Sequence, residues 1–351
     1  MYIDISDKFY GAWWGAFLGD ALAMPTHGYG SQKMLQADYG TITDFVAAKP
    51  QHPESVLNAI TPPELPAQFD CIGSARRELW KQYAIHPHHN FEAGRNTLSL
   101  FLSLHMAVAV TDGGADFHFE DWMKRYQAVM TAPNGHPDTF IPAVHRKYFE
   151  NLAAGKDVKK FGCPDAHIGD IMVFLPLILE GISDLHAAKR RLAKALAYFC
   201  TGETAPNTAY FVSEIVSMLV RGATLEDVLY TIMTPDRHFS LAYPYRRWIK
   251  NKEEESAINM MGRFAKLEEA VPLSIYLSLK HAGDLKGALL VNANIGGETC
   301  GRGALIGMLM GAQCGLKNMP QEMLAKLKYA GEIQALSKAV HDHVMKFKSV
   351  A

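Results

Sequence analysis

The glycine-rich turn at residues 296–303 places three chemically versatile side chains within five positions. Glu298, Cys300 and Arg302 occur in "NANIGGETCGRGALIGMLMGAQCG", residues 292–315. A carboxylate can move a proton, a thiolate can attack an electrophile, and a guanidinium can hold an anion. The residues that follow are almost entirely Gly, Ala, Leu and Met, which indicates a tightly packed helix. Glu298 would lie just before that helix, where the helix dipole stabilises a negative charge.

Two other stretches contribute acids that could work with Glu298. "CPDAHIGD" carries Asp165, His167 and Asp170, and "CTGETAPN" carries Glu203. Two carboxyl groups suffice to cleave a glycosidic bond, one as acid and the other as base or nucleophile, when their surroundings separate their pKa values. A helix cap or a surface charge is the alternative interpretation of each acid, and it is the stronger one for Asp165 and Glu203.

Histidine and cysteine add further candidates. His27 in "PTHGYG" is a possible general acid or base near neutral pH. Cys300 could be a nucleophile with His27 or His167 as its base, although a lone cysteine beside a glycine-rich helix is more often a small buried residue. The histidines of "HPHH", residues 86–89, have no carboxylate or cysteine partner at ligand spacing, so we expect no metal site there.

Two glycine series mark the elements that must position these residues. Each series repeats every four residues, and together they comprise Gly11, Gly15 and Gly19 and then Gly303, Gly307, Gly311 and Gly315. A glycine inside a helix costs about 1 kcal/mol relative to alanine, so a repeated stripe indicates that another backbone approaches closely. If the two stripes meet, closely packed helices would hold the adjoining loops in place.

The remaining pattern predicts an all-α, compact multi-helix single domain spanning residues 1–351. Apolar residues recur at helical spacing in most segments, and no strand-like alternation competes with them. "HIGDIMVFLPLILEGI", residues 167–182, is expected to form one buried helix. Residues 31–90 are irregular and rich in Pro, His and Gln, which predicts an insertion or lid with a short helix around residues 74–84.

Composition limits the classes of partner and the compartment. The 351 residues carry a net charge of −1, so they offer neither the basic field that holds nucleic acid nor a polybasic patch for a membrane. Small molecules or specific protein surfaces are the expected partners, and the oligomeric state stays open. The five scattered cysteines form no C-x-x-C, which favours a reducing cytoplasm. The acidic N-terminus does not resemble a signal peptide, and the apolar runs are too short to span a bilayer, so we expect a soluble protein.

Three segments resemble the ADP-ribosylglycohydrolase family. They are "GAWWGAFLGDALAMPTH" at residues 11–27, "HIGDIMVFLPL" at 167–177 and "VNANIGGETCGRGALIGMLMGAQCG" at 291–315, and they follow the family's order and spacing. The resemblance implies a compact all-α fold with a cleft at one end. It also implies two magnesium ions and hydrolysis of the bond between ADP-ribose and a protein side chain or small molecule.

The chain departs from that family pattern where metal ligands are expected. Gly94-Arg95-Asn96-Thr97 stands in place of a Thr-Asp-Asp-Thr motif, Glu298 and Cys300 replace two aspartates, and His27 replaces an acid. The Arg95 guanidinium would repel a metal ion bound beside it. Two unit charges about 4 Å apart interact by roughly 4 kcal/mol at an effective dielectric constant of about 20, so this repulsion is large. We therefore expect Arg95 to occupy the space of a metal, with Glu298 as its ion-pair partner. No metal and no other cofactor is expected.

The leading hypothesis is a hydrolase that cleaves an N- or O-glycosidic bond of a ribosyl or other sugar-containing small molecule or conjugate without magnesium. The alternatives are a catalytically inactive relative that binds ADP-ribose, a nucleotide or a partner protein, and a purely structural relative. Asp20 is expected to be structural. The candidate catalytic residues are Glu298, Asp170, His27 and Glu203, and the candidate substrate-binding residues are Arg95, Asn96, Thr97, Cys300, Arg302 and His167.

Overall fold

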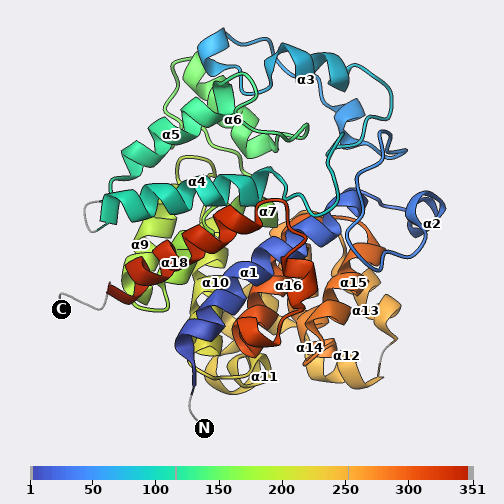
Figure 1. The fold of residues 1–351 in the computed structure, drawn as a ribbon, viewed down its shortest axis with the longest axis vertical. Helices are drawn as coiled ribbons and strands as arrows, with labels where there is room; N and C mark the ends of the chain where they lie inside the picture. Colours follow the sequence, from blue (N-terminus) through green and yellow to red (C-terminus); the bar gives the residue numbers. More distant parts are fainter. Residues whose placement is uncertain (1–2, 115–116, 252, 347–351) are drawn as a thin grey trace.

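The computed structural model describes residues 3–114, 117–251 and 253–346, and within these ranges the chain is all-α, with no β-strand (Figure 1). The expected fold class is therefore confirmed. The α-helices are α1 (Ile5–Ala23), α2 (Gln32–Tyr39), α3 (Gly73–Trp80), α4 (Leu98–Gly113), α5 (Phe119–Thr131), α6 (Ala143–Ala153), α7 (Ile168–Met172), α8 (Leu175–Glu180), α9 (Leu185–Leu196), α10 (Thr204–Val220), α11 (Leu225–Asp227), α12 (Tyr245–Asn251), α13 (Glu254–Met261), α14 (Leu267–Lys280), α15 (Leu285–Ile295), α16 (Thr299–Cys314), α17 (Gln321–Leu324) and α18 (Ala330–Lys346).

The two glycine stripes meet in a central pair formed by α1 and α16, which lie side by side in Figure 1. A Cβ atom added at Gly15 would overlap the carbonyl oxygen of Gly307, and one added at Gly307 would overlap the carbonyl oxygen of Gly15. The same reciprocal overlap relates Gly19 to Gly303. No side chain fits between the two backbones at these points, which explains why glycine is retained despite its low helix propensity.

The order of the glycine contacts makes the pair antiparallel. Gly19 near the end of α1 faces Gly303 near the start of α16, whereas Gly11 faces Gly311. The C-terminal end of the first helix therefore meets the N-terminal end of the second. This arrangement brings the segment after α1, which contains His27, next to the Glu298 turn.

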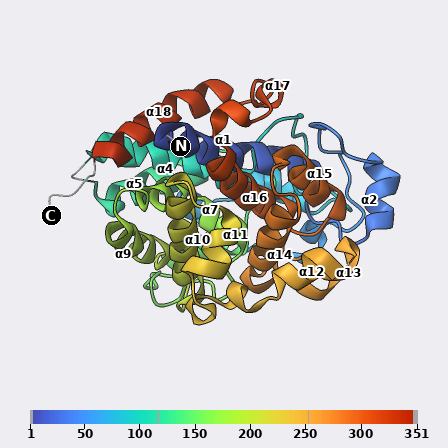
Figure 2. The same ribbon diagram turned by 90° about the horizontal axis from the view of Figure 1, so that it is seen from below.

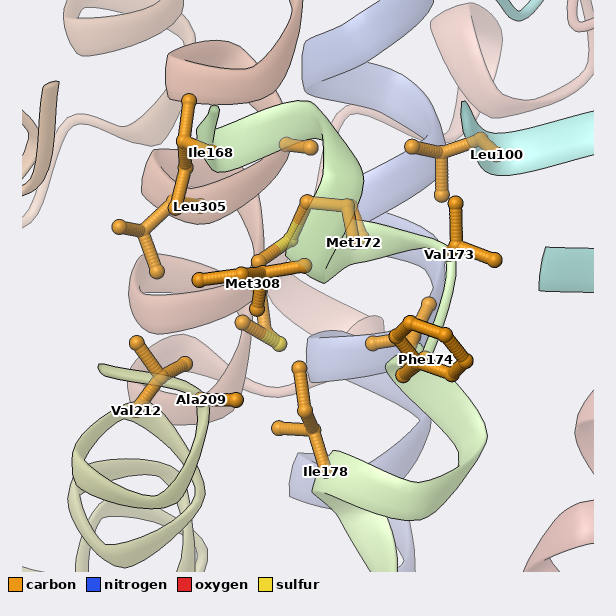
Figure 3. Close-up of a cluster of buried hydrophobic side chains, with 14 of the residues drawn as sticks. Leu100, Ile168, Met172, Val173, Phe174, Ile178, Ala209, Val212, Leu305 and Met308 are labelled. Atoms are coloured by element: carbon orange, nitrogen blue, oxygen red, sulfur yellow. The ribbon is translucent and has the colours of Figure 1, made fainter. Parts of the chain in front are cut away.

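Other helices surround this pair and complete the core. Helices α10 and α14 pack on α16, while α18 packs on α1 (Figure 2). Figure 3 shows one part of the core, where Leu305 and Met308 of α16 lie among apolar side chains of α7, α8 and α10. Met172 and Ile178 are completely buried there. These contacts fix α7, and with it Asp170, against the start of α16.

The prediction of one helix over residues 167–182 is wrong, because the structure divides it into α7 and α8. Helix α7 ends at Met172, and α8 begins at Leu175 with Pro176 in its first turn. Proline has no N–H to donate to the carbonyl four residues earlier, and its ring clashes there. The break leaves α7 as a short element at the candidate site.

Residues 31–90 contain α2, the predicted short helix α3 and, between them, irregular backbone with two short 3-10 helices, Val56–Ala59 and Ala67–Phe69. Figure 1 shows this segment along the top and right of the view, outside the central helix pair. Its end carries His86 and His88, both of which are buried. That this segment acts as a lid stays a prediction.

Two further findings bear on the environment of the chain. All five cysteines are free. Among the described helices, none combines the length and the hydropathy needed to cross a bilayer.

Candidate active site

A narrow cleft lies where the end of α1 meets the first residues of α4, α7 and α16. Its floor and walls come from segments far apart in the sequence. The N-termini of α4 and α16 both open onto it, so their dipoles favour negative charge there. The cleft is lined by His27, His88, Thr97, Leu98, Ser99, Asp138, Phe140, Pro142, His167, Gly169, Asp170, Glu298, Cys300 and Gly301.

A continuous row of hydrogen bonds links two carboxylates through two histidines in this cleft. The Glu298 Oε2 atom lies 2.6 Å from His27 Nε2, and His27 Nδ1 lies 2.7 Å from His88 Nε2. His88 Nδ1 then lies 2.8 Å from Asp138 Oδ1. The two imidazole rings are nearly parallel, at 18°, with centroids 5.0 Å apart. We call this row the relay.

The three hydrogen bonds of the relay, formed together, require a particular number of protons on the two imidazoles. Each ionised carboxylate only accepts hydrogen bonds, so both outer ring nitrogens must donate. The bond between His27 and His88 needs one more proton, so three protons occupy four ring nitrogens. Two neutral imidazoles carry two protons, and the pair therefore holds one imidazolium charge between Glu298 and Asp138. Burial acts to lower the pKa of His27, but the Glu298 carboxylate outweighs it and the pKa is raised.

Glu298 is held as an ionised N-cap of α16, at the position expected from the sequence. Its Oε1 accepts a hydrogen bond from the Gly301 backbone N–H at 2.9 Å. Burial acts to raise the pKa of Glu298, but His27 and the Gly301 N–H together hold it at about 2. The helix dipole acts in the same direction.

Asp138 closes the other end of the relay and was missed by the sequence reasoning. It is 1% exposed, and its Oδ2 accepts the backbone N–H of Leu98, the first residue of α4, at 2.8 Å. Burial acts to raise the pKa of Asp138, yet His88 and this backbone bond lower it overall. Its one local bond, from the Phe140 backbone N–H at 3.3 Å, does not distinguish it from an ordinary turn aspartate, and its relay and helix-cap partners lie 50 and 40 residues away in sequence.

Asp170 lines the same cleft and has the opposite electrostatic character. Its Oδ2 accepts the backbone N–H of His167 at 2.8 Å in a capping box at the start of α7. Burial is the main cause that raises the pKa of Asp170 to about 6, and the Glu298 charge adds to it. The cleft thus holds one carboxyl group whose pKa is raised to about 6, Asp170, and two whose pKa values are lowered, Glu298 and Asp138.

The raised pKa of Asp170 has a consequence for stability. The folded state favours the neutral form, so folding loses stability as the pH rises from about 4 through about 6. We expect Asp170→Asn to raise the free energy of unfolding at pH 8 by up to about 3 kcal/mol, and to have little effect at pH 4. Urea denaturation at the two pH values checks this. Equal stability of the variant and the wild type at pH 8 would contradict the raised pKa.

The expected ion pair between Arg95 and Glu298 is wrong. The Arg95 guanidinium lies 5.4 Å from the ring centroid of Phe91 and 5.9 Å from that of Tyr329, and Glu298 pairs with His27. The cause is the backbone just before Arg95. Gly94 adopts a positive φ of 79°, and its carbonyl accepts the N–H of Lys328 at 2.9 Å, which turns this segment toward Tyr329.

Other predicted substrate-binding residues lie behind the cleft. Arg302 is buried, and its guanidinium donates to Asn292 Oδ1 at 3.0 Å, to the Gly296 carbonyl at 2.6 Å and to the Arg263 carbonyl. Burial lowers the pKa of Arg302 to about 10. These contacts use its donors to fix the turn before α16, so a substrate-binding role is not supported.

The segment before α4 is anchored from behind by Asp20. Asp20 is fully buried and accepts hydrogen bonds from Asn96 Nδ2, Thr97 N and Thr97 Oγ1 at 2.9, 2.8 and 2.6 Å. Asn96 also donates to the Phe17 carbonyl at 2.7 Å, so its amide faces α1. These contacts agree with the expected structural role of Asp20. Thr97 lines the cleft, whereas Asn96 does not.

The remaining candidates divide between the cleft and the surface. His167 and Cys300 line the cleft. Burial raises the pKa of Cys300 well above its usual range, which disfavours the thiolate that a nucleophile requires. Glu203 is exposed just before α10 and lies outside the cleft lining, so the surface interpretation fits it better.

The side chains that line the cleft do not fit the two magnesium ions that the family resemblance implies. Magnesium prefers oxygen ligands in octahedral geometry. Here the oxygens of Glu298 and Asp138 and one oxygen of Asp170 already accept hydrogen bonds from N–H groups, and the potential ligand atoms that cluster in the cleft are the imidazole nitrogens of His27 and His88 and the Cys300 sulfur. Nitrogen and sulfur suit softer cations.

Comparison with known proteins supports both the fold and the family. A protein-family model described as ADP-ribosylglycohydrolase matches residues 1–348. A solved structure titled "ADP-ribosylglycohydrolase-related protein complex" matches with a TM-score of 0.64 and 18% sequence identity, over 97% of this chain and 99% of that one. At this identity the structural likeness shows the fold alone. No curated protein matches the chain at a significant level.

Proposed function

Because the chain belongs to the ADP-ribosylglycohydrolase family, we propose that it hydrolyses an N- or O-glycosidic bond of a ribosyl or other sugar-containing small molecule or conjugate. ADP-ribose conjugates are the first substrates to consider, since the family consists of ADP-ribosyl hydrolases. One observation carries the proposal: Asp170 and Glu298 line the same cleft, and their pKa values are shifted apart, to about 6 and about 2.

The two carboxyl groups would divide the chemistry. Asp170 donates its proton to the leaving atom, because a carboxyl group with a raised pKa is still partly protonated near neutral pH. Glu298 stays ionised and stabilises the positive charge that develops on the anomeric carbon. Water adds to that carbon and passes a proton to Glu298. A weak base suffices here, because water that bonds to a cationic carbon is strongly acidic. Glu298, with its low pKa, releases that proton to solvent, and solvent returns a proton to Asp170.

The relay would supply the positive charge that magnesium supplies in the family. One imidazolium charge is shared by His27 and His88, and it lies against Glu298 at 2.6 Å. This charge keeps Glu298 ionised without a divalent ion. We therefore propose that hydrolysis does not need magnesium.

Residues 31–90 would contribute to specificity. This segment carries His88 into the relay and ends seven residues before Thr97, which lines the cleft. A lid built from this segment would account for its length and its irregular backbone. The free cysteines favour the cytoplasm as the compartment.

The test is turnover of defined conjugates. Purified protein is incubated in EDTA with peptides ADP-ribosylated through arginine or serine and with O-linked small-molecule conjugates of ADP-ribose, and free ADP-ribose is measured by mass spectrometry. We expect release from at least one class. Tight binding without release from any of them would favour an inactive relative and contradict the proposal.

The pH dependence of kcat should follow Asp170. A general acid works only while it is protonated, so kcat should fall about tenfold per pH unit above pH 6. The control is Asp165→Asn, because Asp165 is exposed and lies five residues from Asp170 in the same segment. Its profile should match that of the wild type. A rate that stays constant from pH 6 to pH 9 would remove Asp170 from the role of acid.

A further inference from the structure

Three soft donor atoms come together beside the relay. One ring nitrogen of His27, one of His88 and the Cys300 sulfur all lie within 4.8 Å of one another. His27 and His88 are 61 positions apart in the sequence, and Cys300 follows His88 by 212 positions. The absence of a partner at ligand spacing along the chain therefore gave no sign that these atoms meet in space. The cluster is distinct in chemistry from the family's oxygen ligands.

We propose that His27, His88 and Cys300 bind one thiophilic divalent cation, of which zinc is the reference case. Two imidazoles and a thiolate form a common zinc ligand set, and a catalytic-type site leaves the fourth position to water or substrate. The fourth position here would face the cleft, which all three residues line. This inference does not depend on turnover.

The hydrogen bonds of the relay leave one ring nitrogen of each imidazole for a cation. His27 Nε2 bonds to Glu298 and His88 Nδ1 bonds to Asp138, so the ring nitrogens left over are His27 Nδ1 and His88 Nε2. Those two atoms face each other at 2.7 Å. A carboxylate behind each metal-binding imidazole fixes its tautomer and increases its basicity. A cation would take the place of the single proton that the two imidazoles share.

The surroundings of Cys300 are suited to a thiolate ligand. Cys300 is 3% exposed and packs against Met24 and Phe91, which keep bulk water from the sulfur. Without a cation, this burial disfavours a charged thiolate. A bound cation would compensate the charge. The thiol would lose its proton to solvent, and the shared imidazole proton would leave with it.

The proposed mechanism uses the proton shared by His27 and His88, whereas a bound cation would displace that proton. A bound cation would preserve the hydrogen bonds to Glu298 and Asp138 but would replace the hydrogen bond between His27 and His88. The site can therefore be tested by binding and spectroscopy alone.

The experiment uses the full chain, stripped with chelator and titrated with Zn²⁺, Co²⁺ or Mg²⁺. We expect one Zn²⁺ per chain by calorimetry and mass spectrometry. Co²⁺ should give the visible bands of a tetrahedral site together with a sulfur-to-cobalt charge-transfer band, and Mg²⁺ should not compete. Cys300→Ser should abolish the charge-transfer band and weaken Zn²⁺ binding by about 100-fold or more. Cys314→Ser, at the far end of the same helix, is the matched control and should change neither.

The carboxylates behind the ligands supply a second variant. Asp138→Asn should weaken Zn²⁺ binding by about 10- to 100-fold and keep the charge-transfer band, because it leaves the sulfur ligand in place. Absence of stoichiometric binding, or a Co²⁺ spectrum unchanged in Cys300→Ser, would overturn the inference. Hydrolysis measured separately distinguishes the two proposals. If the protein binds zinc at this site and its hydrolysis requires that zinc, this inference is supported and the metal-free mechanism is refuted.

Discussion

Glu298→Gln should reduce kcat for glycosidic hydrolysis by about 1000-fold. Glutamine is uncharged, so it cannot stabilise the cationic anomeric carbon or take a proton from water. It also removes the carboxylate that His27 contacts at 2.6 Å, and the relay then loses the charge that holds its extra proton. The amide oxygen can still accept the Gly301 N–H, so the start of α16 should keep its cap.

The matched control for this variant is Glu203→Gln. Glu203 also precedes a helix, α10, but it is exposed and lies outside the cleft lining. Its kcat and KM should equal those of the wild type. Steady-state kinetics on the substrate identified in the conjugate panel, with circular dichroism to check folding, measures both variants. Wild-type turnover by a folded Glu298→Gln protein would remove Glu298 from the mechanism.

Gly15→Ala should lower the free energy of unfolding by about 3 kcal/mol or more. In an ordinary exposed helix this change would stabilise the protein by about 1 kcal/mol. Here the added methyl group would overlap the carbonyl oxygen of Gly307, and relief requires the two helices to separate. Because the Gly19–Gly303 contact adjoins the candidate site, separation would also disturb the turn at Glu298.

Gly331→Ala is the control for that prediction. Gly331 lies in the first turn of α18, and an added Cβ would meet nothing within 4 Å. It should be neutral or raise the free energy of unfolding by up to about 1 kcal/mol. Urea denaturation of the three proteins measures both effects. A Gly15→Ala protein as stable as Gly331→Ala would show that the two helices do not need glycine at their crossing.

The features that could be predicted from the sequence are those set by local spacing. Glycine at every fourth residue in two segments predicts helices that another backbone approaches closely, and the contact of Gly15 with Gly307 agrees with this prediction. Glu298 was expected just before a helix because the turn and the helix are adjacent in the chain, and it is the N-cap of α16.

The relay could not be predicted, because it depends on contacts between distant segments. His88 lies in an irregular segment, and Asp138 lies in a loop 50 residues later. Nothing in either local stretch indicates that they meet. The expectation for Arg95 failed for a related reason. A residue that replaces a ligand in a motif need not point into the site, and the turn at Gly94 directs Arg95 toward Tyr329 instead.

The central claim is that side chains, not magnesium, supply the charge for hydrolysis in this cleft. The most direct test is the initial rate of ADP-ribose release by protein dialysed against EDTA, measured as a function of added Mg²⁺. We predict a measurable rate in EDTA that changes by less than twofold up to millimolar Mg²⁺. A rate that is absent in EDTA and is restored by Mg²⁺ would contradict the account.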